Sequence, residues 1–108
     1  MEKLRTSAVS TPPGAMGFCI LNHAAIAAAH AVAEHGLSRV LIVDFDVHHG
    51  NGTQDAFYDD PRVLYFSTHQ SPAYPCTGAV EETGSGDGTG YTVNVPLPPD
   101  VEDESFLQ

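Results

Sequence analysis

The sequence is poor in basic residues. It has 4 Lys and Arg against 14 Asp and Glu, which gives a formal net charge of −10, and no Lys or Arg follows Arg62. Binding to nucleic acid depends largely on cationic side chains that contact phosphates, so this balance argues against nucleic acid as a direct partner. The acidic balance would attract a cationic substrate, although we expect most of these charges to form an ordinary solvated surface.

The sequence also lacks long hydrophobic runs and a cysteine framework. No apolar stretch reaches the roughly 20 residues of a membrane span, because His23, His30 and Glu34 interrupt the alanine-rich segment. Lys3 and Arg5 are not followed by the apolar core of a secretion signal. The two cysteines are too few for a disulfide scaffold. We therefore expect a cytoplasmic protein of one small domain, with reduced thiols and no membrane partner.

The N-terminal part of the sequence predicts a leader and one helix. Residues 1–14 end in Pro-Pro-Gly, which stops regular structure, and we expect them to be a flexible leader. Asn22 can cap a helix that runs to about His35, with Gly36 as the residue that ends it. His23, His30 and Glu34 form a polar stripe on this helix, which we interpret as its solvated face.

The rest of the sequence predicts strands separated by turns. Apolar runs within residues 39–45 and 63–68 predict two strands with these bounds. The interval between them is long enough for a crossover, so we expect parallel neighbours. A short helical turn is expected at 53–58. Residues 91–95 alternate like a third strand, which Pro96 should end. The order of elements indicates the α/β class.

One stretch, residues 41–52, carries most of the chemistry. Four aliphatic residues at 40–43 predict a strand buried on both faces, and such strands place ligands at their carboxyl ends. Asp44, Asp46 and His48 alternate with apolar residues, so they should point to one side while the chain is extended. A mixture of carboxylates and imidazole favours zinc over calcium.

Several functions could use this pattern. An EF-hand loop starting at Asp44 would need glycine and glutamate where the sequence has His49 and Asp55. An aspartate-nucleophile phosphatase also has Asp-x-Asp after a buried strand, but it expects a small hydroxyl residue where His48 stands. A zinc hydrolase would bind metal with Asp46 and His48. Strand-end aspartates can also simply bond a loop. These residues alone leave the alternatives open.

Four segments of the sequence together form a more specific pattern. They are Met16-Gly17-Phe18-Cys19, residues 39–54 with their His-His-Gly-Asn-Gly-Thr core, residues 66–70 (Phe-Ser-Thr-His-Gln) and residues 74–78 (Tyr-Pro-Cys-Thr-Gly). Taken together, they resemble the zinc-dependent histone deacetylase family. The likeness is to class II and bacterial members of the acetoin-utilisation and acetylpolyamine amidohydrolase types. It implies that residues 15–108 are a partial catalytic domain. The expected fold is a partial three-layer α/β/α parallel sheet of the arginase/deacetylase type.

The resemblance also implies a role for each matching residue. Asp46 and His48 would bind zinc, and Asp44 would orient a catalytic histidine. The substrate tunnel would be lined by Gly17, Phe18 and Tyr74. A potassium ion would be held by the side chain of Asp44, the hydroxyl of Ser67 and the backbone carbonyls of Asp44, Asp46, His48 and Thr68. A second monovalent cation would be held by the carbonyls of Phe57, Asp60 and Val63.

The implied reaction is zinc-assisted hydrolysis of N-acetyl-lysine or of a related polyamine-type amide. The sequence departs from the family pattern in three places. The tandem histidines expected after Pro12-Pro13-Gly14 are missing, and neither the third zinc ligand nor the catalytic tyrosine is found. We therefore expect a truncated, inactive piece of a deacetylase. The alternative is a noncatalytic remnant or interaction domain.

Overall fold

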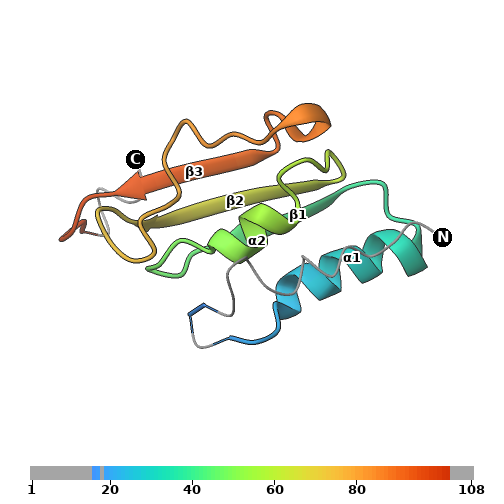
Figure 1. Cartoon of the computed structure of the whole chain (residues 1–108), viewed down its shortest axis with the longest axis horizontal. Helices are drawn as coiled ribbons and strands as arrows, with labels where there is room; N and C mark the ends of the chain where they lie inside the picture. The colour runs from blue at the N-terminus through green and yellow to red at the C-terminus, as the bar shows by residue number, and fades with distance from the viewer. Residues whose placement is uncertain (1–15, 18, 103–108) are drawn as a thin grey trace.

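The structure of the chain is a computed structural model that describes residues 16, 17 and 19–102. Figure 1 shows the elements in chain order, and Phe18 and the expected leader at residues 1–14 lie outside the described part. The elements are α1 (His23–His35), β1 (Val40–Asp44), α2 (Asn51–Ala56), β2 (Val63–Gln70), the short 3-10 helix η2 (Gly86–Gly88) and β3 (Thr92–Leu97).

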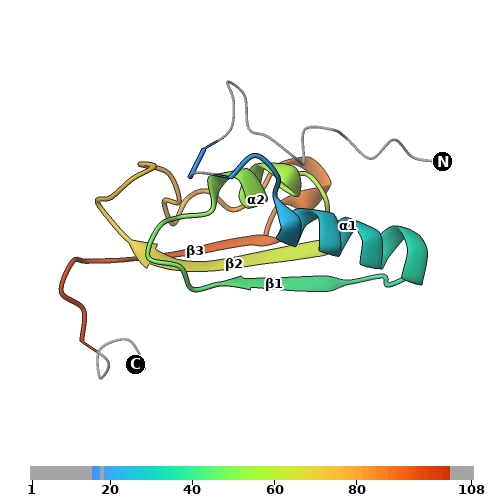
Figure 2. The ribbon, with the colours of Figure 1, turned by 90° about the horizontal axis from the view of Figure 1, so that it is seen from below.

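The three strands form one parallel sheet in the order β1-β2-β3. Val40 of β1 lies opposite Val63 of β2, and Tyr65 of β2 lies opposite Thr92 of β3. The crossover between β1 and β2 therefore produces parallel neighbours, as the sequence predicts. Both helices cover the same face of the sheet (Figure 2). The described residues thus form two of the three layers expected for the fold.

Helix α1 begins and ends where its cap residues predict. The side-chain oxygen of Asn22 accepts a hydrogen bond from the backbone N–H of Ala25 at 2.9 Å, and Gly36 adopts a left-handed conformation with φ of 64°. Ala25 and Ala28 are buried against the sheet, whereas the predicted polar stripe is exposed. Small side chains on the inner face let the helix pack closely on the strands.

Asn22 also joins the two helices, and its removal should therefore be costly. Its amide donates a hydrogen bond to the hydroxyl of Thr53 in α2 at 2.8 Å. We expect Asn22→Ala to lower the free energy of unfolding by about 1–2 kcal/mol, measured by urea denaturation. Glu34→Ala, on the exposed face of the same helix, should change it by less than about 0.5 kcal/mol. Equal effects of the two changes would mean that the cap does not stabilise the chain.

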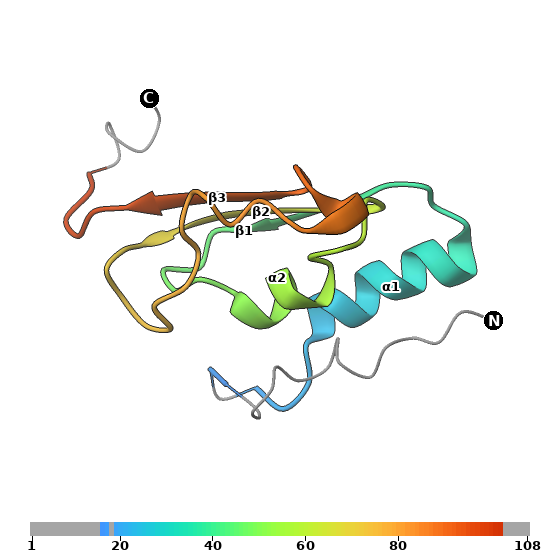
Figure 3. The same cartoon turned by 45° about the horizontal axis from the view of Figure 1, so that its top comes forward.

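The core lies between the helices and the inner face of β2. Ala25, Ala28, Phe57 and Val63 form one buried cluster, with Val40, Ile42 and Ala56 packed against it. Along β2, every second side chain is buried, and these are Val63, Tyr65, Ser67 and His69. The apolar half of the strand anchors the core, and the polar half extends toward the carboxyl edge of the sheet. The segment after β2 folds back on the side of α2 (Figure 3).

Strand β1 corrects one prediction from the sequence. It is not buried on both faces, because Leu41 and Val43 are 61% and 52% exposed while Val40 and Ile42 face the helices. The apolar run correctly predicts the strand. Burial of its outer face requires a layer that the described residues do not supply.

The bounds of two other strands also differ from the prediction. Strand β2 extends to Gln70, beyond the predicted end at residue 68, so His69 lies within the strand. Pro96 does not end β3, because it lies within the strand and opposite His69. A proline is tolerated there since β3 is an edge strand of the described sheet, where the missing N–H faces no neighbour. Within the described residues, no helix has both the length and the apolar character to span a membrane.

Candidate metal centre

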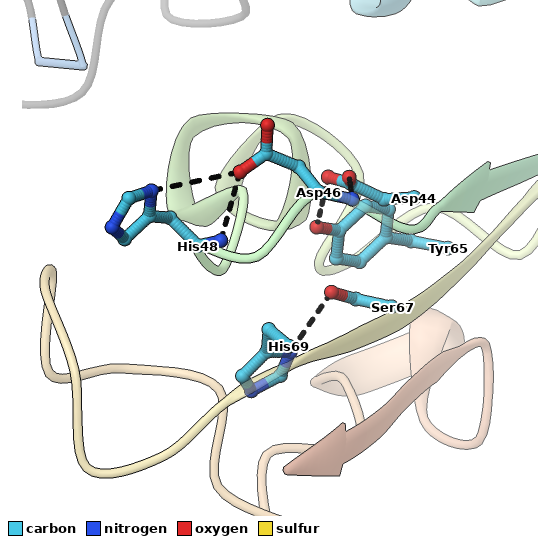
Figure 4. A network of polar contacts seen from close by, with 6 residues as sticks. All are labelled: Asp44, Asp46, His48, Tyr65, Ser67 and His69. Carbon is cyan, nitrogen blue, oxygen red and sulfur yellow. Dashed lines mark hydrogen bonds and ion pairs between the residues drawn. The ribbon is translucent and has the colours of Figure 1, made fainter. Parts of the chain in front are cut away.

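Asp44, the last residue of β1, has a carboxylate that is fixed by two donors. Its Oδ2 accepts a hydrogen bond from the hydroxyl of Tyr65 at 2.9 Å, and its Oδ1 accepts one from the backbone N–H of Asp46 at 3.2 Å (Figure 4). Burial raises the pKa of Tyr65, and the charge of Asp44 raises it further, so the phenol keeps its proton and remains a donor. The position of Asp44 is therefore determined by the neighbouring strand.

Asp46 and His48 come together through turns and not through strand alternation, because the strand ends at Asp44. Each aspartate accepts a hydrogen bond from the backbone two residues later, and the bond from the N–H of His48 to Oδ1 of Asp46 is 2.8 Å long. The Nδ1 atom of His48 lies 3.6 Å from Oδ1 of Asp46. Figure 4 shows the two side chains facing each other. The side chains of His48 and Asp46 are 56% and 68% exposed, respectively, so a ligand can reach them.

The spacing of these two donor atoms fits zinc. Tetrahedral zinc binds oxygen and nitrogen at about 2.0–2.2 Å, which requires the two donors to be about 3.4 Å apart. Oδ1 of Asp46 and Nδ1 of His48 are close to that separation. Within the described residues, no group of three or more His, Cys, Asp or Glu could hold a metal. This part of the chain can therefore supply two ligands of a metal centre.

The residues predicted to hold potassium border the same site. Nε2 of the buried His69 lies 2.9 Å from the carbonyl of Gly78, which can only accept, so Nε2 carries the proton. Nδ1 then accepts from the hydroxyl of Ser67 at 2.9 Å. The oxygen of Ser67 keeps its lone pairs and could contact a cation beside Asp44. Thr68, the residue after Ser67, would contribute its backbone carbonyl and not its side chain.

The second predicted cation site lies in the turn before β2. The three predicted residues are spaced three positions apart and are linked by backbone hydrogen bonds. The carbonyl of Phe57 accepts from the N–H of Asp60 at 3.1 Å, and the carbonyl of Asp60 accepts from the N–H of Val63 at 3.4 Å. A carbonyl oxygen has two lone pairs, so each of these can still contact an ion. The turn brings the three predicted residues together, and their role stays a prediction.

Next to His48, the buried His49 belongs to a polar network that the sequence does not predict. Nε2 of His49 lies 3.0 Å from Oε1 of Gln54, and its Nδ1 lies 2.7 Å from the hydroxyl of Thr77. The amide nitrogen of Gln54 donates to Glu82 at 2.6 Å, so its oxygen faces the imidazole. Burial lowers the pKa of His49, and the bond to Gln54 offsets part of this effect. His49 is therefore neutral, with its proton on Nε2.

Glu82 is the charged member of this network. Burial alone would raise the pKa of its carboxyl, but hydrogen bonds from Gln54 and from the backbone N–H groups of Ala79 and Gly78 bring the pKa below its ordinary value. Asn94 donates to Oε1 of Gln54 at 2.7 Å and to the backbone carbonyl of Glu82 at 3.1 Å. These residues are 12 to 40 positions apart, and no local pattern in the sequence marks them as partners.

Two of the predicted tunnel residues are described. The ring of Tyr74 lies 6.1 Å from that of His48, edge to face, and the side chain is exposed. Gly17 is exposed, with φ of 61°, and the sulfur of the preceding Met16 contacts the side-chain amide of Asn51 at 3.4 Å. Phe18 lies outside the described residues. Tyr74 thus lies beside the predicted zinc ligand, and its role as a tunnel wall stays a prediction.

The fold and this site together define an α/β protein with a candidate metal centre at the carboxyl edge of a parallel sheet. The chain belongs to the histone deacetylase family, whose model, the histone deacetylase domain, matches residues 10–108. This finding confirms the resemblance inferred from the four sequence segments.

Individual relatives agree with the family. The chain is 55% identical over 89 residues to a protein of Oryza sativa named histone deacetylase 10, chloroplastic, covering 82% of this chain and 20% of that protein. It is 50% identical over 107 residues to a probable deacetylase of Archaeoglobus fulgidus, covering 93% of this chain and 30% of that protein.

A solved structure supports the fold. The crystal structure of a histone deacetylase homologue from Aquifex aeolicus matches with a TM-score of 0.84 and 40% identity, covering 94% of this chain and 28% of that one. The predicted arginase/deacetylase type of fold is therefore confirmed. The chain spans between a fifth and a third of the length of these relatives.

Proposed function

We propose that this chain is the part of a zinc-dependent deacetylase that supplies two metal ligands and one wall of the substrate site. The substrate would be N-acetyl-lysine or a related polyamine-type amide. The observation that supports this most strongly is the 3.6 Å separation of Asp46 Oδ1 and His48 Nδ1, in a chain of the histone deacetylase family. The acidic surface would favour the approach of a cationic substrate.

Each residue of the site has a part in this proposal. Asp46 and His48 would hold zinc, which when bound polarises the acetyl carbonyl and lowers the pKa of a water molecule. Asp44 would orient a histidine general base, and its bond to Tyr65 keeps its carboxylate in place. Tyr74 would pack against the stem of the acylated amine, and the carbonyl of Gly17 would accept its amide N–H.

Monovalent cations would complete the electrostatics of the site. A potassium ion beside Asp44 and Ser67 would offset the charge of the two neighbouring aspartates. A second would bind to the carbonyls in the turn at 57–63. Both cysteines are free and exposed, which suits a reducing compartment such as the cytoplasm.

The 108-residue chain alone should be a poor catalyst. A catalytic zinc normally has three protein ligands, and the described residues supply two. We therefore expect weak zinc binding and no hydrolysis.

A second candidate, a noncatalytic interaction domain, is favoured by the exposed apolar face of the sheet, which includes Leu41, Val43 and Val93.

Zinc binding tests the proposed site. We expect His48→Ala to weaken zinc binding by the 108-residue chain at least about tenfold in a competition assay with a chromophoric chelator, because one of two ligands is lost. His30→Ala, which removes an exposed imidazole from α1, is the matched control and should bind as the unchanged chain does. Equal binding by the two variants would refute the site.

Activity assays on the same chain separate the candidate functions. A fluorogenic acetyl-lysine peptide should not be hydrolysed above the buffer rate, and robust chelator-sensitive hydrolysis would contradict the expected inactivity. A phosphate ester with magnesium, assayed in parallel, tests the aspartate-nucleophile alternative that Asp44 suggests.

A further inference from the structure

Two loops that carry predicted site residues are connected through buried side chains. The ligand loop, residues 45–50, contains His48 and His49. The Tyr74 loop, residues 71–82, contains Tyr74, Thr77 and Glu82. His49 is linked to the Tyr74 loop in two ways. It is hydrogen-bonded directly to Thr77, and it is hydrogen-bonded to Gln54, whose amide is in turn bonded to Glu82.

We propose that Glu82 is a positioning residue that couples these two loops and fixes the orientation of His49. The coupling rests on the proposed function in one respect, namely that His48 binds zinc and Tyr74 lines the substrate tunnel. Under this proposal, Glu82 holds the metal ligand and the tunnel wall in one arrangement, although it touches neither metal nor substrate.

The direction of each hydrogen bond supports the role of Glu82. Its carboxylate faces only donors: the backbone N–H of Gly78 at 3.1 Å, that of Ala79 at 3.1 Å and the amide of Gln54 at 2.6 Å. A carboxylate cannot donate, so the amide nitrogen of Gln54 must point to Glu82 and its oxygen away from it. The orientation of Gln54 is therefore set by Glu82.

Gln54 passes this orientation on to His49. Its oxygen can only accept, so the neutral imidazole carries its proton on Nε2 and presents a bare Nδ1. Nδ1 then accepts from the hydroxyl of Thr77, which lies in the same loop as Glu82. The circuit of hydrogen bonds closes, and each bond in it pairs one donor with one acceptor.

The packing at the centre of the circuit is tight. The rings of His49 and His69 lie 4.7 Å apart, and Gly78 is next to both of them. A Cβ atom at Gly78 would come within 2.5 Å of Nε2 of His69 and 2.6 Å of the ring of His49. A rotation of the His49 ring would therefore displace the Tyr74 loop, and displacement of that loop would release His49.

Three variants of the 108-residue chain test the coupling. Glu82→Gln replaces one of the two accepting oxygens by an NH₂ group, a donor that then faces other donors. Glu81→Gln, at the exposed neighbouring position, makes the same change of charge outside the network and is the matched control. The double variant Gln54→Glu with Glu82→Gln exchanges the carboxylate and the amide. In it, position 54 still accepts from His49 and Asn94, and position 82 can still accept from the Tyr74 loop.

Nuclear magnetic resonance gives two readouts that need no metal. The ¹⁵N resonances of the His49 ring distinguish the Nε2–H form from the Nδ1–H form, and we expect Glu82→Gln to lose the single Nε2–H form. Hydrogen exchange at the amides of Gly78 and Ala79 should become about tenfold faster. Glu81→Gln should change neither readout, and the double variant should restore both.

Zinc affinity is the third readout. We expect Glu82→Gln to weaken zinc binding by about tenfold, the lower end of the effect of losing groups that orient a ligand. If Glu82→Gln behaves as Glu81→Gln in all readouts, or if the exchanged pair fails to restore the His49 form while remaining folded, the coupling is refuted. If the unchanged chain binds no zinc but the two NMR readouts respond as expected, the proposed function fails and the coupling stands.

Discussion

Replacing Gly78 by alanine is expected to lower the free energy of unfolding by about 2–5 kcal/mol. Two costs add at this position. The backbone of Gly78 has φ of 87°, which is unfavourable for a residue with a side chain. The new Cβ would also lie 2.5 Å from Nε2 of His69 and 2.6 Å from the ring of His49, and both rings are buried and bonded at both nitrogens. Neither ring can withdraw without breaking a hydrogen bond.

Gly90 provides the control for this prediction. Its φ is also 87°, but no atom lies within 4 Å of the position that a Cβ would occupy. Gly90→Ala should therefore cost only the backbone part, about 1–2 kcal/mol. Urea denaturation of both variants separates the two costs, and if Gly78→Ala is unfolded in water, its folded fraction at 25 °C gives the lower bound. Equal destabilisation would show that the contacts with His49 and His69 contribute nothing.

The parts of the fold that depend on residues close together in the sequence could be predicted from it. Asn22 and Gly36 define the helix α1 because capping is a property of a few consecutive residues. The apolar runs at 40–43 and 63–66 define two strands for the same reason. Asp46 and His48 could be proposed as candidate metal ligands because they follow shortly after a strand. The roles proposed for them came from the resemblance of the sequence to the histone deacetylase family.

The parts that depend on the detailed path of the chain, or on residues far apart in the sequence, could not be predicted. Asp46 and His48 face each other through two aspartate turns, whereas the alternation of residues predicted only that they would point to one side of an extended chain. Gln54, Glu82 and Asn94 meet only after the sheet has formed, and each alone reads as an ordinary surface residue. Whether the outer face of β1 is covered depends on other segments, so an apolar run cannot decide it.

The tight contact of Gly50 with Asp44 and Tyr65 leads to the second large effect. A Cβ at Gly50 would lie 2.5 Å from Oδ2 of Asp44 and 2.7 Å from the hydroxyl of Tyr65. The φ of Gly50 is −83°, which any residue can adopt, so the cost is steric alone. We expect Gly50→Ala to lower the free energy of unfolding by about 2–3 kcal/mol, measured by urea denaturation. The change would also displace the carboxylate that lies beside the candidate zinc ligands.

Tyr65→Phe makes this prediction specific to the site. Alone it should cost about 1–3 kcal/mol, since Asp44 loses a donor in a partly buried place. In the Tyr65→Phe background, however, one of the two obstructing atoms is absent, and among the described residues the carboxylate of Asp44 is held only by the backbone N–H of Asp46. The two substitutions should therefore cost less together than the sum of their separate effects, by at least about 1 kcal/mol. Strictly additive effects would mean that Gly50 does not accommodate the bond between Tyr65 and Asp44. A sub-additive result would link the glycine after the two histidines to the position of Asp44, and thus to the geometry of the candidate metal centre.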